Sequence, residues 1–162
     1  MTFSSGEVLT AANLNAALGP SRILQIAHSE TETQYLTTAT TYQDITALTT
    51  SITPQSTSST LLVLVTLTVG HDDYTGGFIR MKRNGATIAL DPAAWFYSGN
   101  SNSGYAGLGV SFMAAMSPAS TSAQTLLVQF KSENANWTTI NRSRNDSSQS
   151  GASTMTIFEV SA

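Results

Sequence analysis

The sequence contains no cysteine, and this absence removes several kinds of chemistry at once. A chain without thiols forms no disulfide, builds no zinc–thiolate site and has no cysteine nucleophile. The absence leaves the cellular compartment undecided.

Charge is also scarce. Charged residues make up 10% of the 162-residue chain, whereas an ordinary globular domain carries about a quarter. The formal net charge is −3, which disfavours a nucleic-acid-binding protein, since such proteins carry a basic surface. Serine and threonine together supply 46 of the 162 residues, so hydroxyl groups make up most of the polar surface. Hydrophobic residues reach 41%, which is enough for the core of one domain.

No hydrophobic run is long enough to cross a membrane. The longest, 61–69, is interrupted by Thr66 and Thr68 and falls well short of the ~20 residues required. Residues 1–7 lack the basic and apolar regions of a signal peptide. We therefore expect no membrane insertion and no signal-directed secretion.

One helix is expected, at the N-terminal end. Thr10 is a suitable N-cap for residues 11–18, and Gly19 with Pro20 ends the segment. A helix this short is marginal alone, so its apolar side chains require a partner. Either the helix folds back on its own domain or it docks on another chain.

The remainder of the chain is typical of short β-strands. The pattern predicts strands over 22–28, 34–39, 41–48, 49–53, 60–70, 77–83, 86–90, 105–116, 123–131, 137–142 and 153–160. The dipeptide Asn84-Gly85 indicates a two-residue hairpin turn, and 91–104 is expected to be a long loop. Parallel strands need long crossovers, usually helical, so the sheets must be antiparallel.

These elements predict an all-β protein: an antiparallel two-sheet sandwich or jelly roll, preceded by a short N-terminal arm and helix. The expected division is 1–20 for the arm and helix and 21–162 for the sandwich. Period-2 spacing assigns eight side chains to the space between the sheets: Leu61, Val63, Val65, Phe112, Leu126, Val128, Phe130 and Ile157.

Candidate catalytic and metal sites are few. The densest group of reactive side chains, His71-Asp72-Asp73-Tyr74, follows the strongest strand and is expected to be a solvated loop rather than a metal site. His28 is expected to be a core or edge histidine. No nucleophile-elbow, phosphate-loop or dinucleotide motif occurs. We therefore predict no enzyme activity, no catalytic or metal-binding residues and no cofactor.

The one basic cluster lies in a predicted strand. Strand alternation sets Arg80 and Lys82 on one face and Arg83 on the other, which makes a weak phosphate site and favours a solvated or edge strand.

Aromatic residues bracket the predicted loop 91–104. Trp95, Tyr97 and Tyr105, if exposed there, would suit sugar stacking or a protein interface. The alternative is that Trp95 and Phe96 fold the loop onto the core.

Several stretches resemble structural proteins of tailed-bacteriophage virions. The opening FSSGEVLTAANLN at 3–15 resembles the N-terminal segment of many such proteins. The stretches ITPQSTSSTLLV at 52–63, RMKRNGATI at 80–88 and MTIFEV at 155–160 resemble a small β-domain common among phage tail-fibre and structural proteins.

This resemblance implies a non-enzymatic, homotrimeric component of the virion exterior, assembled in the host cytoplasm. It implies a short tail fibre that binds a receptor, such as a host surface glycan, or a capsid decoration protein. Almost no chain separates the arm from the first strand, which favours a compact knob over a long fibre. The arm would attach to a portal or tail-adaptor protein or to the major capsid protein, through Phe3, Val8, Leu9, Leu14 and Leu18. A carbohydrate-binding module of lectin-like type, with no role for the arm, is the alternative.

Overall fold

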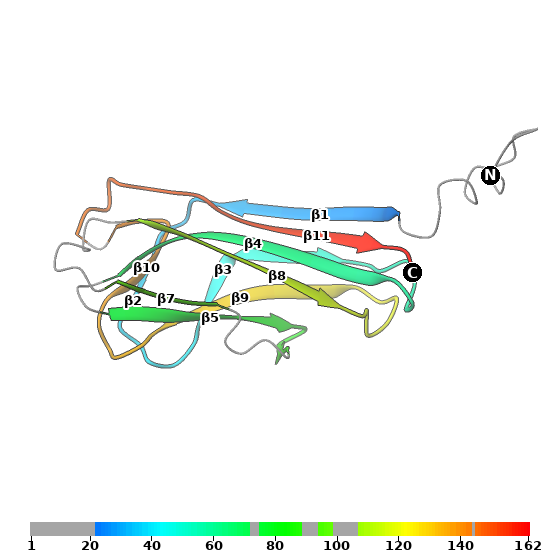
Figure 1. Ribbon diagram of the computed structural model, residues 1–162, viewed down its shortest axis with the longest axis horizontal. Coiled ribbons are helices and arrows are strands. Elements are labelled where there is room, and N and C mark those ends of the chain that lie inside the picture. The colour runs from blue at the N-terminus through cyan, green and yellow to red at the C-terminus, as the bar shows by residue number, and fades with distance from the viewer. Residues whose placement is uncertain (1–21, 72–74, 89–93, 99–106, 144) are drawn as a thin grey trace, which may run out of the picture.

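The computed structural model describes residues 22–71, 75–88, 94–98, 107–143 and 145–162 (Figure 1). These residues form two antiparallel sheets, as the sequence predicts, and contain no helix long and apolar enough to cross a membrane. The strands are β1 (Ile23–Thr31), β2 (Tyr35–Thr37), β3 (Gln43–Ile52), β4 (Thr60–His71), β5 (Thr75–Arg83), β6 (Ala86–Thr87), β7 (Ala94–Ser98), β8 (Leu108–Met116), β9 (Gln124–Ser132), β10 (Thr138–Ile140) and β11 (Ser153–Val160).

The first sheet is built around β4. One edge of β4 pairs with β11, which pairs with β1, and the last residues of the same edge pair with β10, which pairs with β2. The other edge of β4 pairs with β8 over nine residues without a register shift. The second sheet has the order β3-β9-β5, and the free edge of β5 pairs with both β6 and β7.

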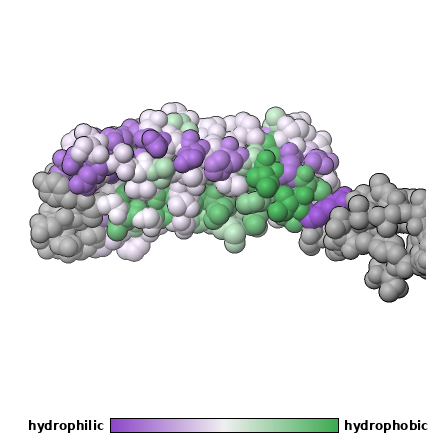
Figure 2. Space-filling view, turned by 90° about the horizontal axis from the view of Figure 1, so that it is seen from above, coloured by the Kyte–Doolittle hydropathy of each residue, from purple (hydrophilic) through white to green (hydrophobic). Residues whose placement is uncertain are grey.

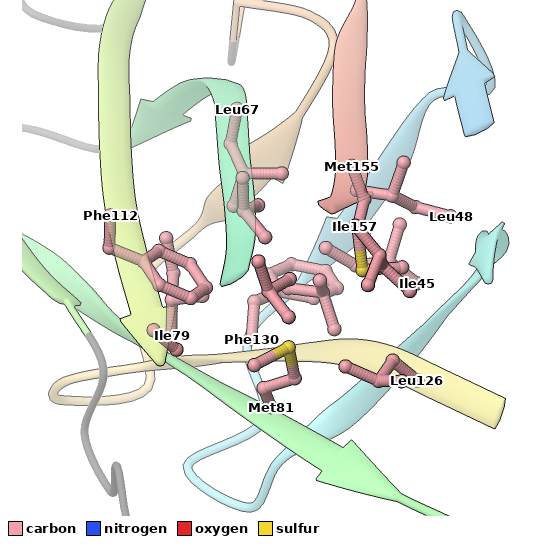
Figure 3. Packing of buried hydrophobic residues seen from close by; sticks show 14 of the residues in the cluster. Ile45, Leu48, Leu67, Ile79, Met81, Phe112, Leu126, Phe130, Met155 and Ile157 are labelled. Carbon is pink, nitrogen blue, oxygen red and sulfur yellow. The ribbon is translucent and has the colours of Figure 1, made fainter. Parts of the chain in front are cut away.

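The core lies between the sheets and consists of the alternate residues that the period-2 pattern identified (Figure 3). All eight predicted core side chains are buried. Further members of the cluster come from β3 and β5, among them Ile45, Leu48, Ile79 and Met81. Burying a side chain of this size stabilises the fold by about 1.5–3 kcal/mol, so this cluster supplies most of the driving force.

Several local predictions are confirmed and others are wrong. Asn84 and Gly85 have φ values of 51° and 82°, as a two-residue turn between β5 and β6 requires. The strands predicted at 41–48 and 49–53 are one strand, β3, whose pairing with β9 shifts between Asp44 and Thr49. The predicted loop 91–104 contains β7, which pairs with β5. The expected N-terminal arm, its helix and the 20/21 boundary lie outside the described residues.

A buried carboxylate joins three segments at one end of the sandwich. Glu159 on β11 is fully buried and accepts hydrogen bonds from Ser59 Oγ at 2.6 Å, Gln25 Nε2 at 2.6 Å, Gln55 N at 2.8 Å and Ser56 N at 3.2 Å. These donors belong to β1 and to the connection through which the chain passes from the second sheet to the first. Burial alone would raise the pKa of Glu159, but the hydrogen bonds outweigh it and lower the pKa below its ordinary value of 4.5.

Replacing Glu159 with Gln should lower the free energy of unfolding at pH 7 by at least about 1.5 kcal/mol, because an amide cannot accept all of these hydrogen bonds. A carboxylate whose pKa is depressed by folding stabilises the protein above its unfolded-state pKa and loses this effect as the pH falls through the folded pKa. Urea unfolding should therefore show a constant difference between wild type and Glu159→Gln from pH 6 to pH 8, and a shrinking one below about pH 4.5. A difference that grows on acidification would contradict the assignment.

Candidate functional site

Strand β7 sends its side chains alternately into the core and out to solvent. Phe96 points inward and is 5% exposed, while Trp95 and Tyr97 point outward and are 55% and 46% exposed. The Phe96 ring occupies the space above Gly77, where a Cβ atom would come within 2.6 Å of it. The sequence left two alternatives for this segment: Trp95 and Phe96 pack onto the core, or the aromatic residues are exposed. Phe96 packs onto the core, whereas Trp95 is exposed.

Trp95 and Tyr97 form an exposed aromatic stack. Their ring centroids are 5.9 Å apart and their planes differ by 22°. They are two residues apart on one strand, so strand alternation holds both on the outer face of the second sheet. Tyr105, the third aromatic residue predicted for this site, lies outside the described residues.

The stack continues across the sheet as a row of rings and cations. Phe78 on β5 is the register partner of both Trp95 and Lys131. The Lys131 ammonium lies 5.0 Å from the ring centroid of Phe78 and 4.8 Å from that of Tyr42. The guanidinium carbon of Arg80 lies 3.9 Å from the Tyr42 centroid. Cation–π contacts of this kind hold the charged groups over the sheet surface.

Polar groups border this row on one side. Arg80 Nε donates to Gln129 Oε1 at 2.7 Å, and Gln129 Nε2 donates to the Asp44 carboxylate. Asp44 is also 3.8 Å from the Lys82 ammonium. An open hollow of about 560 Å³ beside these groups is lined by residues of β2, β3, β5 and β9, including Asp44 and Gln129, and by Tyr42, which precedes β3.

We name these residues together the aromatic–cationic face: Tyr42, Asp44, Phe78, Arg80, Lys82, Trp95, Tyr97, Gln129 and Lys131. Flat rings beside hydrogen-bonding and charged groups suit a ligand that has apolar ring faces and polar edges, as sugars do. The sequence placed Arg80 and Lys82 on one face of a strand, but β5 is an interior strand rather than an edge. Tyr42, Phe78, Gln129 and Lys131 were missed, because pairing between strands distant in sequence cannot be read from local alternation.

The histidines lie elsewhere. His71 ends β4 fully buried, with its ring 6.0 Å from that of Phe96, so the prediction of a solvated loop is wrong for this residue. Its sequence neighbours Asp72, Asp73 and Tyr74 are outside the described residues. His28 is an exposed residue of β1, an edge strand, and its Nδ1 lies 2.9 Å from Thr156 Oγ1, as expected for an edge histidine. Among the described residues, no three His, Asp or Glu gather as metal ligands.

The outer face of the first sheet has a different character. Register pairing aligns Ile26, Phe158, Leu62 and Ala115 in one row across four strands, and Leu64 opposite Met113 in the next row. Leu64 and Met113 are 42% and 64% exposed. Figure 2, seen from the side on which β1 and β11 lie, shows hydrophobic side chains gathered toward one end of the molecule. We name this surface the apolar platform, formed by Ile23, Ile26, Leu62, Leu64, Met113, Ala115, Phe158 and Val160.

No protein-family model matches the chain, and no curated protein matches its sequence.

Trp95 and Phe96 are adjacent residues with opposite orientations, which provides a matched pair of substitutions. Trp95→Ala should lower the free energy of unfolding by about 0.5–1.5 kcal/mol, the value of an aromatic pair, whereas Phe96→Ala should cost about 3–5 kcal/mol. Urea denaturation followed by circular dichroism measures both values. Equal losses for the two variants would contradict the orientation of β7.

Proposed function

We propose that this chain is a structural component of a bacteriophage virion that is attached by its N-terminal arm and projects the aromatic–cationic face toward the host surface. The sequence resemblance at 3–15, 52–63, 80–88 and 155–160 supports the virion assignment. The Trp95–Tyr97 stack is the observation that carries the binding role, because two large rings exposed side by side on a sheet offer a surface on which a ligand can stack.

The positions of the two ends of the molecule are consistent with this proposal. The chain enters the sandwich at Ile23, which pairs with Val160, which in turn pairs with Thr60 at the start of β4. The aromatic stack belongs to β7, and Phe96 of this strand lies beside His71 at the other end of β4. Figure 1 shows β7 toward the end of the sandwich opposite to the start of β1. The twelve residues of β4 span about 40 Å. An arm at one end would therefore leave the stack at the end that faces away from the particle.

We propose further that the sandwich is a jelly roll. Eight strands support this, in the orders β1-β11-β4-β8 and β3-β9-β5-β7. Along the chain these strands alternate between the two sheets, apart from the consecutive pair β5 and β7. Such alternation is expected of two interlocked Greek keys.

The apolar platform supports contact between subunits, and the sequence resemblance implies that the assembled form is a homotrimer. A cluster of large exposed hydrophobic side chains on a charge-poor sheet is typical of a surface that is covered by another subunit. Beyond the apolar platform, the outer face of the first sheet carries hydroxyl groups. The next row contains Thr66 and Ser111, whose hydroxyl oxygens lie 3.1 Å apart. We therefore assign the subunit contact to the platform and leave the hydroxyl-rich end to solvent.

A carbohydrate-binding module without an anchoring role is the second candidate, favoured by the same Trp95–Tyr97 stack. The two candidates differ in the part they give to the arm. In the virion protein, the partners of the arm are a portal or tail-adaptor protein or the major capsid protein, whereas the isolated module requires no such partner.

Deleting residues 2–18 should leave a folded, soluble oligomer with a nearly unchanged Tm that no longer assembles onto particles. The reason is that Val8, Leu9, Leu14 and Leu18 would each contribute about 1.5–3 kcal/mol when buried against a virion protein. Replacing Leu14 and Leu18 together with Asp should have the same effect. Thermal melting and particle incorporation, assayed by density-gradient sedimentation, measure the two results. Normal incorporation of the deleted chain would favour the isolated module, and unfolding would show that the arm belongs to the domain's own core.

Leu64→Lys should convert the trimer to a folded monomer, because an unpaired charge in an apolar contact costs several kcal/mol. Thr66→Lys, two residues along the same strand and face but outside the platform, is the matched control and should stay trimeric. Size-exclusion chromatography with light scattering gives the mass of each. A monomeric wild type, or a trimeric Leu64→Lys, would contradict this assignment.

A further inference from the structure

We infer that the ligand of the aromatic–cationic face is an acidic saccharide, a sugar chain that carries carboxylate or sulfate groups. This inference rests on the proposed function, namely that the face binds a glycan, and it adds the charge of that glycan.

The first argument is the distribution of charge. The whole chain has seven Lys and Arg residues and a net charge of −3, yet Arg80, Lys82 and Lys131 all belong to this one face. In the strands that form it, β3, β5, β7 and β9, Asp44 is the single acidic residue, and it pairs with Lys82. Glu133 lies beyond the end of β9. A cationic surface on an anionic chain attracts an anion specifically to that surface.

The second argument is the way in which Lys131 and Arg80 are held. The Lys131 ammonium lies between the rings of Tyr42 and Phe78, and no described carboxylate forms an ion pair with it. The Arg80 guanidinium stacks on Tyr42 and is fixed by the bond from its Nε to Gln129. Cations that are positioned in advance lose little side-chain entropy when an anion binds, and guanidinium groups match carboxylate and sulfate oxygens in shape.

The third argument is spacing. Trp95, Phe78 and Lys131 occupy one row on three adjacent strands, in the pairs Trp95–Phe78 and Phe78–Lys131. Neighbouring strands lie about 4.8 Å apart, so the backbones of Trp95 and Lys131 are separated by about 10 Å across the sheet, and the Lys131 ammonium lies over Phe78 between them. A short oligosaccharide can stack one ring on Trp95 and present an acidic group of a following residue to Lys131 and Arg80.

The test uses the full chain and saccharides in matched pairs. Carboxylated oligosaccharides are compared with the same oligosaccharides reduced to alcohols, and sulfated ones with their desulfated forms, first on an array and then by titration calorimetry. The two pairs distinguish a carboxylate from a sulfate as the recognised group. Three variants are measured beside wild type: Lys131→Met removes the ammonium, Trp95→Ala removes the ring on which a sugar would stack, and Arg83→Met is the control. Arg83 is on the same strand as Arg80, but its side chain lies on the opposite face of the strand and donates to the Ser117 carbonyl.

We expect at least one acidic saccharide to bind roughly tenfold or more tightly than its neutral partner, and Lys131→Met to abolish that preference. Trp95→Ala should weaken binding of both members of the pair, and Arg83→Met should leave binding unchanged. Affinity should fall as salt is added.

Three outcomes would overturn the inference, and they separate it from the proposed function. Equal binding of acidic and neutral partners, lost in Trp95→Ala, would leave the glycan-binding face intact and refute the requirement for an acidic group. Binding of no saccharide, or binding unaffected by Trp95→Ala, would refute the glycan-binding face itself. An equal loss in Arg83→Met and Lys131→Met would show that only overall charge matters, and this also overturns the inference.

Discussion

The arrangement of this β-sandwich depends on two buried polar side chains, one at each end of β4. Glu159 accepts hydrogen bonds from β1 and from the connection between β3 and β4. At the other end Asn141, also fully buried, donates to the carbonyls of Thr31 and Thr33 and accepts from Ser153 Oγ. Backbone N–H and C=O groups in the connections between strands lack partners within a sheet and still need hydrogen bonds. In this chain, which has few charged residues, the two side chains supply such hydrogen bonds without ion pairs.

The scarcity of charge makes its placement informative. The first sheet exposes the apolar platform at the end where the chain enters, and hydroxyl groups beyond it. The second sheet exposes rings and cations, toward the opposite end at Trp95 and Tyr97. One sandwich thus has two outer faces with different chemistry, as the proposed function requires of a domain that joins subunits through one surface and binds a ligand with the other.

The limits of prediction are clearest around β7. The sequence between Asp91 and Gly104 has the composition of a loop, and a five-residue strand inside it is stabilised by pairing with β5, which no local pattern reports. Phe96 of the same strand packs beside the buried ring of His71, at a centroid distance of 6.0 Å. Lys131 and Tyr42 are distant in sequence, and their meeting over one surface depends on the order of strands β3, β9 and β5.

By itself, the sequence determined the all-β class, the antiparallel pairing, the turn at Asn84-Gly85 and the inward-facing residues of the main strands. These follow from side-chain alternation and turn chemistry, which act over a few neighbouring residues. Only the tertiary structure decided which strands are neighbours, and with it the stack of Trp95 on Tyr97, the row from Trp95 to Lys131 and the apolar platform. Strand neighbours are selected by the packing of the whole core, so surfaces assembled from several strands exist only once that core has formed.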